Sequence, residues 1–477
     1  MARAASILGI CALATVSGAA IAPLRAQSAN VVAADSMRPA DSTRLVAMTV
    51  RARLRNVLGA RVMKAGSLDS TPETHDREIL SPKSVRFSFD GTKVYVNALE
   101  GGKTLVYAWP SLHKLPTIVH RFGPADSALF RGDSTVFDYP YFTQSPDGSA
   151  NLFTGRPVES ELSTDGRWLF VPYYRRSFDA SAQSPSALAV IDTRVDSIVR
   201  VLPTGPIPKY VAASPNGRLL AVTHWGDNTV ALLDVSSGDP AKFHYVRHMV
   251  VERVLDQTPL AGTDRDRTCG FCLRGTVFTR NGRTLLVARM GKKGGVAGFD
   301  VASGRYLGTV MAVPRTPRHL ELSADGRTLF ASSGDAGVVS HVSAARVVTA
   351  LRGARGKRVR GPRWRSVPVG GGARTIALDP SGTVLLVALN WRSEIVAVDA
   401  TRLTVLARVR VAPYAVGLAI APDGSGAVVT SQGHIAAKGS PARKRGLRLG
   451  GNSVDVLRLT WSGGEPAKSK ETGSTAP

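Results

Sequence analysis

A short turn that ends in glycine recurs seven times along the chain, and this repeat limits the possible folds more than any other feature of the sequence. An Asp or Asn before glycine is typical of tight hairpin turns, because glycine tolerates the positive φ that they require. The glycines lie 42 to 75 residues apart, which indicates a unit of roughly 40 to 45 residues with insertions. The seven turns are SFDG (88–91), STDG (163–166), SPNG (214–217), TRNG (279–282), SADG (323–326), DPSG (379–382) and APDG (421–424).

Each turn stands between two strand-like segments, as in TVFTRNGRTLLVARM and HLELSADGRTLFASS. A third strand usually follows, for example NTVALLDV (228–235), and a fourth returns, for example LTVLARVRV (403–411). Four antiparallel strands repeated seven times predict an all-β fold, a seven-bladed β-propeller. Since glycine and proline recur and apolar residues alternate or run together, we expect no helix.

The seventh unit lacks a fourth strand, because only a polar tail follows Trp461. An unclosed propeller would leave an exposed sheet edge. We therefore predict that a segment within residues 44–66 supplies the missing strand and closes the ring. The expected organisation is a signal peptide (1–26), an N-terminal segment with the closing strand (27–80), the propeller (81–461) and a disordered tail (462–477).

The first residues predict export. Arg3 precedes an apolar run from Ile7 to Ala22, and cleavage after Ala26 fits the small-residue rule of signal peptidases. We expect a periplasmic or extracellular protein. No later segment has 18 unbroken apolar residues, so we expect no membrane span.

The chain is strongly basic, with a formal net charge of +25. Such a surface favours anionic partners. Arginine greatly outnumbers lysine, however, and codon bias is an equally good explanation of the bulk charge.

The segments IPKYVAASPNGRLLAV and THWGDNTVALLDV resemble the YVTN-type repeats of YncE-like β-propellers. The resemblance covers roughly residues 80 to 461, and it implies the same propeller fold. It specifies function poorly, because that superfamily includes binding proteins, lactonases and a haem d1 domain.

A basic residue recurs eight positions before the turn glycine in five of the seven units. Because the first strand of a blade is the innermost, these residues should meet at the mouth of the central channel. The next position of the same register holds Glu159, Tyr210, His319 or Thr375 in four units. The candidate ligand-binding residues are Lys83, Lys209, Arg274, Arg318, His319 and Arg374.

Two interpretations of these cations remain open. Converging cations repel one another, and an anion would offset that cost. Alternatively, each cation pairs with an acid on a neighbouring blade, such as Glu161 or Glu321, as a structural latch. The long links at 123–156, 174–187, 251–273 and 436–451 should lie on the face of the channel mouth, which favours a binding site there. The basic run at 351–365 should lie on the opposite face, as a solvated loop or as a site for an acidic polymer or membrane surface.

Cys269 and Cys272 are the cysteines that remain after export, and we expect them to form a disulfide. His244 and His248 lie on one predicted strand and are about 13 Å apart there, so they do not share a zinc ion. One histidine with the two cysteines stays an alternative, but we expect no metal and no cofactor.

The sequence contains no G-x-S-x-G, H-E-x-x-H, P-loop or Rossmann glycine motif, so we assign no catalytic residue. The expected function is binding of an anionic small molecule, or of an acidic envelope polymer or protein, at the channel mouth by a monomer. A lactonase-like hydrolase that uses the same basic mouth is the alternative. We do not expect nucleic acid as a partner, because aromatic residues do not alternate with the basic runs.

Overall fold

The computed structural model describes residues 44–56, 71–131, 152–255, 264–291, 293–311, 313–435, 448–449 and 451–462. The chain divides into two compact units, residues 1–31 and 32–477, and the described residues belong to the second unit. The predicted signal peptide and all but the first residue of the predicted tail lie outside the described residues.

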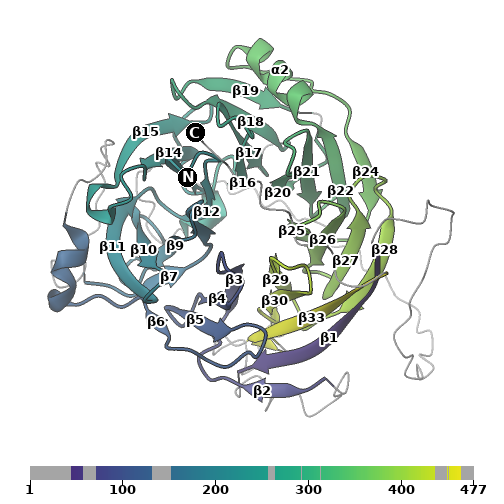
Figure 1. Ribbon diagram of the computed structural model, residues 1–477. Helices are drawn as coiled ribbons and strands as arrows, with labels where there is room; N and C mark the ends of the chain where they lie inside the picture. The colour runs from purple at the N-terminus through teal and green to yellow at the C-terminus, as the bar shows by residue number, and fades with distance from the viewer. Residues whose placement is uncertain are drawn as a thin grey trace, which may run out of the picture. The chain divides into compact units, whose positions relative to one another are not determined.

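Seven antiparallel sheets stand around a central axis like the blades of a propeller (Figure 1). This arrangement confirms the predicted fold class. The first blade contains β3 (Pro82–Phe87), β4 (Lys93–Ala98), β5 (Lys103–Ala108) and β6 (Ile118–Val119), and the second contains β7 (Gly155–Pro157), β8 (Glu161–Leu162), β9 (Trp168–Arg176), β10 (Ser186–Asp192) and β11 (Ser197–Thr204). The third blade contains β12 (Pro208–Ala213), β13 (Leu219–His224), β14 (Thr229–Asp234) and β15 (His244–Val250). The fourth blade contains β16 (Leu273–Phe278), β17 (Thr284–Arg289), β18 (Gly295–Asp300) and β19 (Tyr306–Val310).

The remaining three blades follow the same order from the axis outward. The fifth blade contains β20 (Pro317–Leu322), β21 (Thr328–Ser333), β22 (Val338–Ser343) and β24 (Arg365–Pro368). The sixth blade contains β25 (Ala373–Leu378), β26 (Val384–Leu389), β27 (Glu394–Asp399) and β28 (Val405–Arg410). The seventh blade contains β29 (Ala415–Ile420), β30 (Gly426–Ser431), β33 (Ser453–Trp461) and β1 (Leu45–Arg55). Smaller elements are β2 (Glu73–His75), β23 (Arg358–Val359), β31 (His434–Ile435), β32 (Arg448–Leu449) and the 3-10 helices η1 (Pro124–Phe130), η2 (Pro240–Lys242) and η3 (Arg265–Thr268).

The repeated turns link the first and second strands of each blade. All seven turn glycines have φ between 67° and 73°, in the left-handed region that side-chain-bearing residues seldom adopt. In SADG, the amide of Gly326 donates to the carbonyl of Ser323 at 2.7 Å. The backbone conformation of the turn therefore explains why each motif ends in glycine.

The core lies between neighbouring blades. Leu286 of β17 and Leu329 of β21 are fully buried in one such cluster. The second strands are covered on both faces, and all six residues of β26, VLLVAL, are buried. Their continuous apolar sequence follows from this position, because a sheet packed on both faces has no solvent side.

The ring closes as the sequence predicts. β1 pairs antiparallel with β33 from Leu45 opposite Trp461 to Arg55 opposite Ser453, and the two strands lie side by side in Figure 1. β1 is thus the outer strand of the seventh blade, and β2 adds a short parallel strand outside it.

One expectation is wrong, because the link between β22 and β24 contains the helix α2 (Ala344–Ala354). Its buried residues are Ala344, Val347, Leu351 and Ala354, spaced at three and four positions as on one helix face. Leu351 packs against Gly298 of β18, where an added Cβ would lie 2.5 Å from the leucine side chain. The contact with the neighbouring blade stabilises this helix. It was not predicted, because the sequence around it has the pattern of β-strands.

Among the described residues, no helix combines the length and apolar character needed to cross a bilayer.

Candidate functional site

The five basic residues of the recurring register lie together at the inner strands. Each is the second residue of its strand, and β3, β12, β16, β20 and β25 surround the axis in Figure 1. A cavity of about 740 Å³ runs along these strands and continues to the hairpin turns at Ser88 and Ser214. Arg274, Arg318 and Arg374 line it. The offset in sequence thus corresponds to a ring of positions in space.

A local irregularity places consecutive side chains in the channel. The pairing between the first and second strands shifts near the start of the inner strand in six blades, for example between Pro317 and Leu320. The second blade shows the same shift between Gly155 and Pro157. A β-bulge re-aims side chains that would otherwise alternate between two faces. Both Arg318 and His319 line the cavity for this reason.

Burial and mutual repulsion act on the cations. Burial and the guanidinium groups of Arg374 and Arg274 lower the pKa of Lys83 well below its usual value, while Glu159 opposes the shift. The same causes lower the pKa of Arg318. Like charges in a concave, partly dry site raise the free energy of the unliganded state, and a bound anion lowers it.

Two of the five cations have carboxylate partners, as the latch interpretation predicts. Lys209 forms an ion pair with Asp266, and its ammonium lies 4.0 Å from the centre of the Trp225 ring. Arg274 Nη2 lies 3.6 Å from Glu159 Oε1. The partners are not the ones that the sequence suggested.

The other three cations of the ring, Lys83, Arg318 and Arg374, have surroundings that differ from those of Lys209 and Arg274. Lys83 and Arg318 form no ion pair with any carboxylate of the described residues. The Nε of Arg318 is buried and has no hydrogen-bond partner in the described part of the chain. Arg374 Nε donates to the carbonyl of Val416 at 3.3 Å. The cluster is therefore only partly neutralised by protein carboxylates.

A second layer lies three residues further along the inner strands. It consists of Arg86, Glu161 and Glu321, which also line the cavity. Arg86 Nη2 contacts Glu161 Oε2 at 2.8 Å and donates to the carbonyl of Ser160 at 2.9 Å. Burial raises the pKa of Glu321 to about 7, and the nearby Glu161 adds to the shift while Arg86 opposes it.

Arg86 is a site residue that the sequence patterns did not predict, and Glu161 and Glu321 were expected only as latch partners. A signal was present, because all three stand five residues before a turn glycine. Glu161 does form an ion pair, but with Arg86 rather than with a cation of the ring.

His319 has a fixed hydrogen-bond arrangement between the two layers. Its Nδ1 accepts from the amide of Ile376 at 3.0 Å, so the neutral ring carries its proton on Nε2 and donates it to the hydroxyl oxygen of Tyr210. Burial, together with Arg86 and Arg274, lowers the pKa of His319 to about 3. His319 is neutral near pH 7 and orients the Tyr210 hydroxyl.

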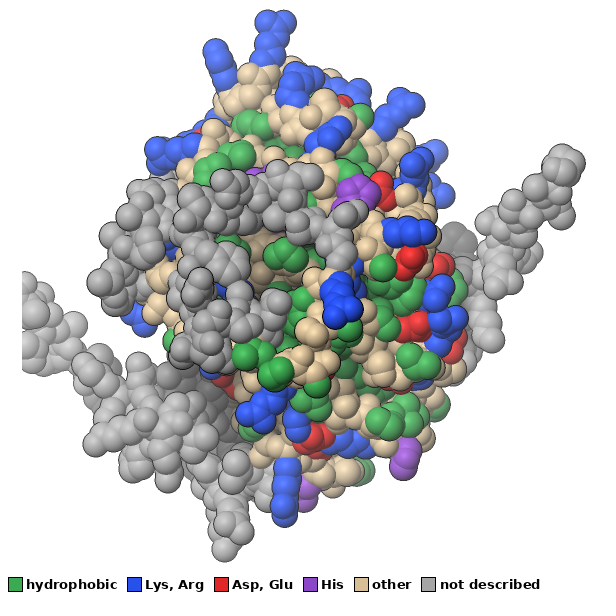
Figure 2. All heavy atoms as spheres, turned by 90° about the vertical axis from the view of Figure 1, so that its left-hand side faces the viewer, with side chains coloured by type: hydrophobic (Ala, Val, Ile, Leu, Met, Phe, Trp, Pro, Cys, Tyr) green, Lys and Arg blue, Asp and Glu red, His purple; other side chains and the backbone are tan. Residues whose placement is uncertain are grey.

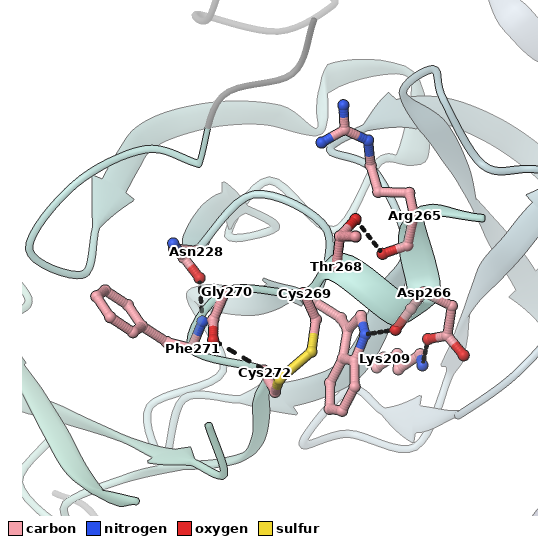
Figure 3. Close-up of a disulfide and its surroundings, with 10 residues drawn as sticks. Lys209, Asn228, Arg265, Asp266, Thr268, Cys269, Gly270, Phe271 and Cys272 are labelled. Carbon is pink, nitrogen blue, oxygen red and sulfur yellow. Dashed lines mark hydrogen bonds and ion pairs between the residues drawn. A yellow bond between two sulfur atoms is a disulfide. The ribbon is translucent and has the colours of Figure 1, made fainter. Parts of the chain in front are cut away.

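The predicted disulfide joins Cys269 and Cys272. It lies directly after η3, which carries Asp266, the partner of Lys209 (Figure 3). The indole Nε1 of Trp225 donates to the carbonyl of Asp266 at 3.0 Å. The disulfide-containing loop thus holds the counter-ion of one channel cation.

A possible metal site occurs elsewhere, where ligand atoms of His224, Asp227 and His248 lie within 4.8 Å of one another. However, Nε2 of His224 accepts from the amide of Gly205 at 3.1 Å. Its Nδ1 lies 2.8 Å from Thr229 Oγ1, which in turn donates to Asp227 Oδ1 at 2.6 Å. Both ring nitrogens are engaged, so the geometry fits a buried hydrogen-bond network better than a metal centre.

The basic run at 351–365 lies in the link between β22 and β24, but it is not confined to the side of the hairpin turns as predicted, because Arg358 contacts Glu252 in the link between the third and fourth blades. Part of it is folded rather than a loop, since it includes the end of α2, and β23 pairs with β19. Arg358 Nη2 contacts Glu252 Oε2 at 2.6 Å. Figure 2 shows that Lys and Arg side chains are spread over one side of the propeller, with acidic groups among them.

The long links expected on the mouth face are described only in part. Residues 132–151, 256–263 and 436–447 lie outside the described residues.

No protein-family model and no curated protein sequence matches this chain. Similar solved structures include a chain of the Kuenenia stuttgartiensis hydrazine synthase, with a TM-score of 0.52 and 14% identity over 82% of this chain and 99% of that chain. Another is the Myceliophteria thermophila Cps50 (Swd1) β-propeller domain, with a TM-score of 0.51 and 11% identity over 80% of this chain and 97% of that one. At these identities the likeness establishes the β-propeller fold alone.

Proposed function

We propose that this protein binds an anionic small molecule, or an anionic group of an acidic envelope polymer or protein, in its central channel and performs no chemistry on it. The observation that carries this proposal is Arg318. Its guanidinium lies beside Arg274 and Arg374, lacks a carboxylate partner among the described residues and lines the cavity. An arginine presents five donors in a planar fork that fits carboxylate and phosphate groups.

Export to the periplasm or the cell exterior is part of this proposal. The disulfide between Cys269 and Cys272 supports it, because such bonds persist mainly in oxidising compartments. Membership of the YVTN-type, YncE-like proteins is an inference that depends on the repeat motifs of the sequence.

Isothermal titration calorimetry with inorganic phosphate and with hexanoate tests the binding site. Arg318→Ala should weaken binding of the anion that binds wild type by about tenfold or more, the value of a charge-assisted hydrogen bond. Arg327→Ala is the matched control, since it removes the same charge from the same blade at a side chain that is 87% exposed. Equal binding by wild type and Arg318→Ala would contradict the proposal.

A lactonase-like hydrolase is a second candidate. Glu321 favours it, because a carboxyl group with a pKa of about 7 in a cavity can serve as a general base near neutral pH. Turnover of lactones by wild type that disappears in Glu321→Gln and in Arg318→Ala would replace the binding-only proposal with this one.

A further inference from the structure

Arg318 and Glu321 lie on one strand and line the same cavity. They are three residues apart in β20, which corresponds to about 10 Å between their Cα atoms in an extended strand. Residues three apart normally point to opposite faces of a sheet. The register shift between Pro317 and Leu320 changes this alternation, so one strand presents a cation and a carboxylate to the same space.

Among the described residues, Glu321 is the carboxylate of the cavity lining that has no Lys or Arg within ion-pair distance. Glu159 lies beside Arg274, and Glu161 is held by Arg86. The side chain of Glu321 forms no hydrogen bond with the described residues. Nε2 of His319 lies 4.0 Å from its Oε2, but that imidazole is neutral and donates to Tyr210.

The cavity is therefore polarised along its length. In the first layer, Arg318 has no carboxylate partner within the described residues, and Arg274 and Arg374 line the cavity with it. In the second layer, about 10 Å further along β20, Glu321 exposes 35% of its side chain. A ligand with an anionic group at one end and a cationic group at the other satisfies both ends, whereas a simple anion leaves the carboxylate without a partner.

We propose that the ligand is an elongated zwitterion, in which a carboxylate or phosphate contacts Arg318 and an ammonium group contacts Glu321. This inference rests on the proposed function, since it uses the same channel. It adds the selectivity for a second charge on the ligand, and it assigns that selectivity to Glu321.

The test compares 6-aminohexanoate with hexanoate, which has the same chain and carboxylate but no amine. Binding to the full chain is measured by calorimetry at pH 8. Wild type should bind 6-aminohexanoate about tenfold more tightly than hexanoate, as expected for one charge-assisted hydrogen bond. Glu321→Gln should abolish this preference. Arg318→Ala should weaken the binding of both compounds.

Glu100→Gln is the matched control, because Glu100 is 50% exposed and contacts Arg156 away from the cavity. It should retain the preference. If Glu321→Gln does not fold, as judged by circular dichroism, Glu321→Ala replaces it.

The outcomes separate the two proposals. If hexanoate and phosphate fail to bind, or bind independently of Arg318, the proposed function is wrong and this inference falls with it. If hexanoate binding depends on Arg318 but the amine adds no affinity, only the zwitterion inference is wrong. A preference that persists in both Glu321 variants also contradicts the inference.

Discussion

Arg53 of β1 and Asp455 of β33 form a buried ion pair, with 2.5 Å between Nε and Oδ1, although they are 402 positions apart in the chain. Asp455 is fully buried, and its Oδ2 accepts from the amide of Ala412 at 2.6 Å. The pair therefore joins the first described strand to the last one and to the link after the sixth blade.

Replacing Arg53 with Ala should lower the free energy of unfolding by about 3–5 kcal/mol, because the carboxylate of Asp455 would stay buried without its cation. Urea unfolding followed by circular dichroism measures the change. Arg327→Ala is the control, since Arg327 and Asp325 form an ion pair in which both side chains are exposed, by 87% and 56%, and it should leave stability almost unchanged. Equal midpoints for wild type and Arg53→Ala would show that the ion pair does not stabilise the closure.

The preference for 6-aminohexanoate over hexanoate should depend on pH through Glu321. Its pKa is raised to about 7 by burial, and the charged or titratable groups that face it are Arg86, Glu161, His319 and Tyr210. Below pH 7 the carboxyl is protonated and does not attract an ammonium group, while above pH 7 it is ionised. Calorimetry from pH 6 to pH 8.5 should show the preference rising, and a constant ratio would contradict the assignment to Glu321.

His120 should make the fold sensitive to acid. Its Nε2 lies 2.7 Å from Thr104 Oγ1 and its Nδ1 lies 2.9 Å from Tyr173 Oη, and burial lowers its pKa from 6.5 to about 3. As the pH falls from 6.5 towards 3, the unfolded chain gains a proton that the folded chain does not. The free energy of unfolding should then decrease by up to about 1.4 kcal/mol per pH unit from this group.

Urea unfolding of wild type and His120→Gln at pH 7.5, 6 and 5 measures this dependence. The variant should be less stable at pH 7.5 but lose less stability towards pH 5. Parallel curves would assign the acid sensitivity to other groups.

Loss of the disulfide should destabilise the propeller only modestly. The Cys269–Cys272 bond closes a very short loop, and the entropy removed from the unfolded chain corresponds to about 2 kcal/mol. The double variant Cys269→Ser/Cys272→Ser should match the stability of wild type in reductant. Reductant should have no effect on the variant itself, and a response there would point to another cause.

The blade count and the strand order could be predicted from the sequence because hairpin turns are local. A glycine such as Gly326 can adopt positive φ because it has no Cβ. The same turn motif, with a glycine at positive φ, occurs in all seven blades. The closing strand within 44–66 was predictable by counting, since one strand of the seventh blade was missing. The helix α2 was not, because its stability depends on Leu351 packing against a different blade.

The candidate site divides in the same way. The basic residues recur at the same position of the repeat, eight residues before the turn glycine. Their convergence at the central axis could therefore be predicted. Their partners could not, since Asp266 lies in an insertion with no repeat counterpart and Glu159 stands on another blade. The second layer with Arg86 also has a register in the sequence, five residues before a turn glycine, but a β-bulge that the residue pattern does not reveal determines that its side chains face the cavity.

By itself the sequence determined a ring of seven similar blades with basic residues at the start of the inner strands, because turn chemistry, strand pattern and register each act over a few neighbouring residues. Only the tertiary structure decided that Lys209 and Arg274 have carboxylate partners while Arg318 has none among the described residues, and that Glu321 faces the same cavity. These differences arise from the distances between charged groups on different blades and from the burial of their side chains. Both quantities determine the electrostatic energy of a charge.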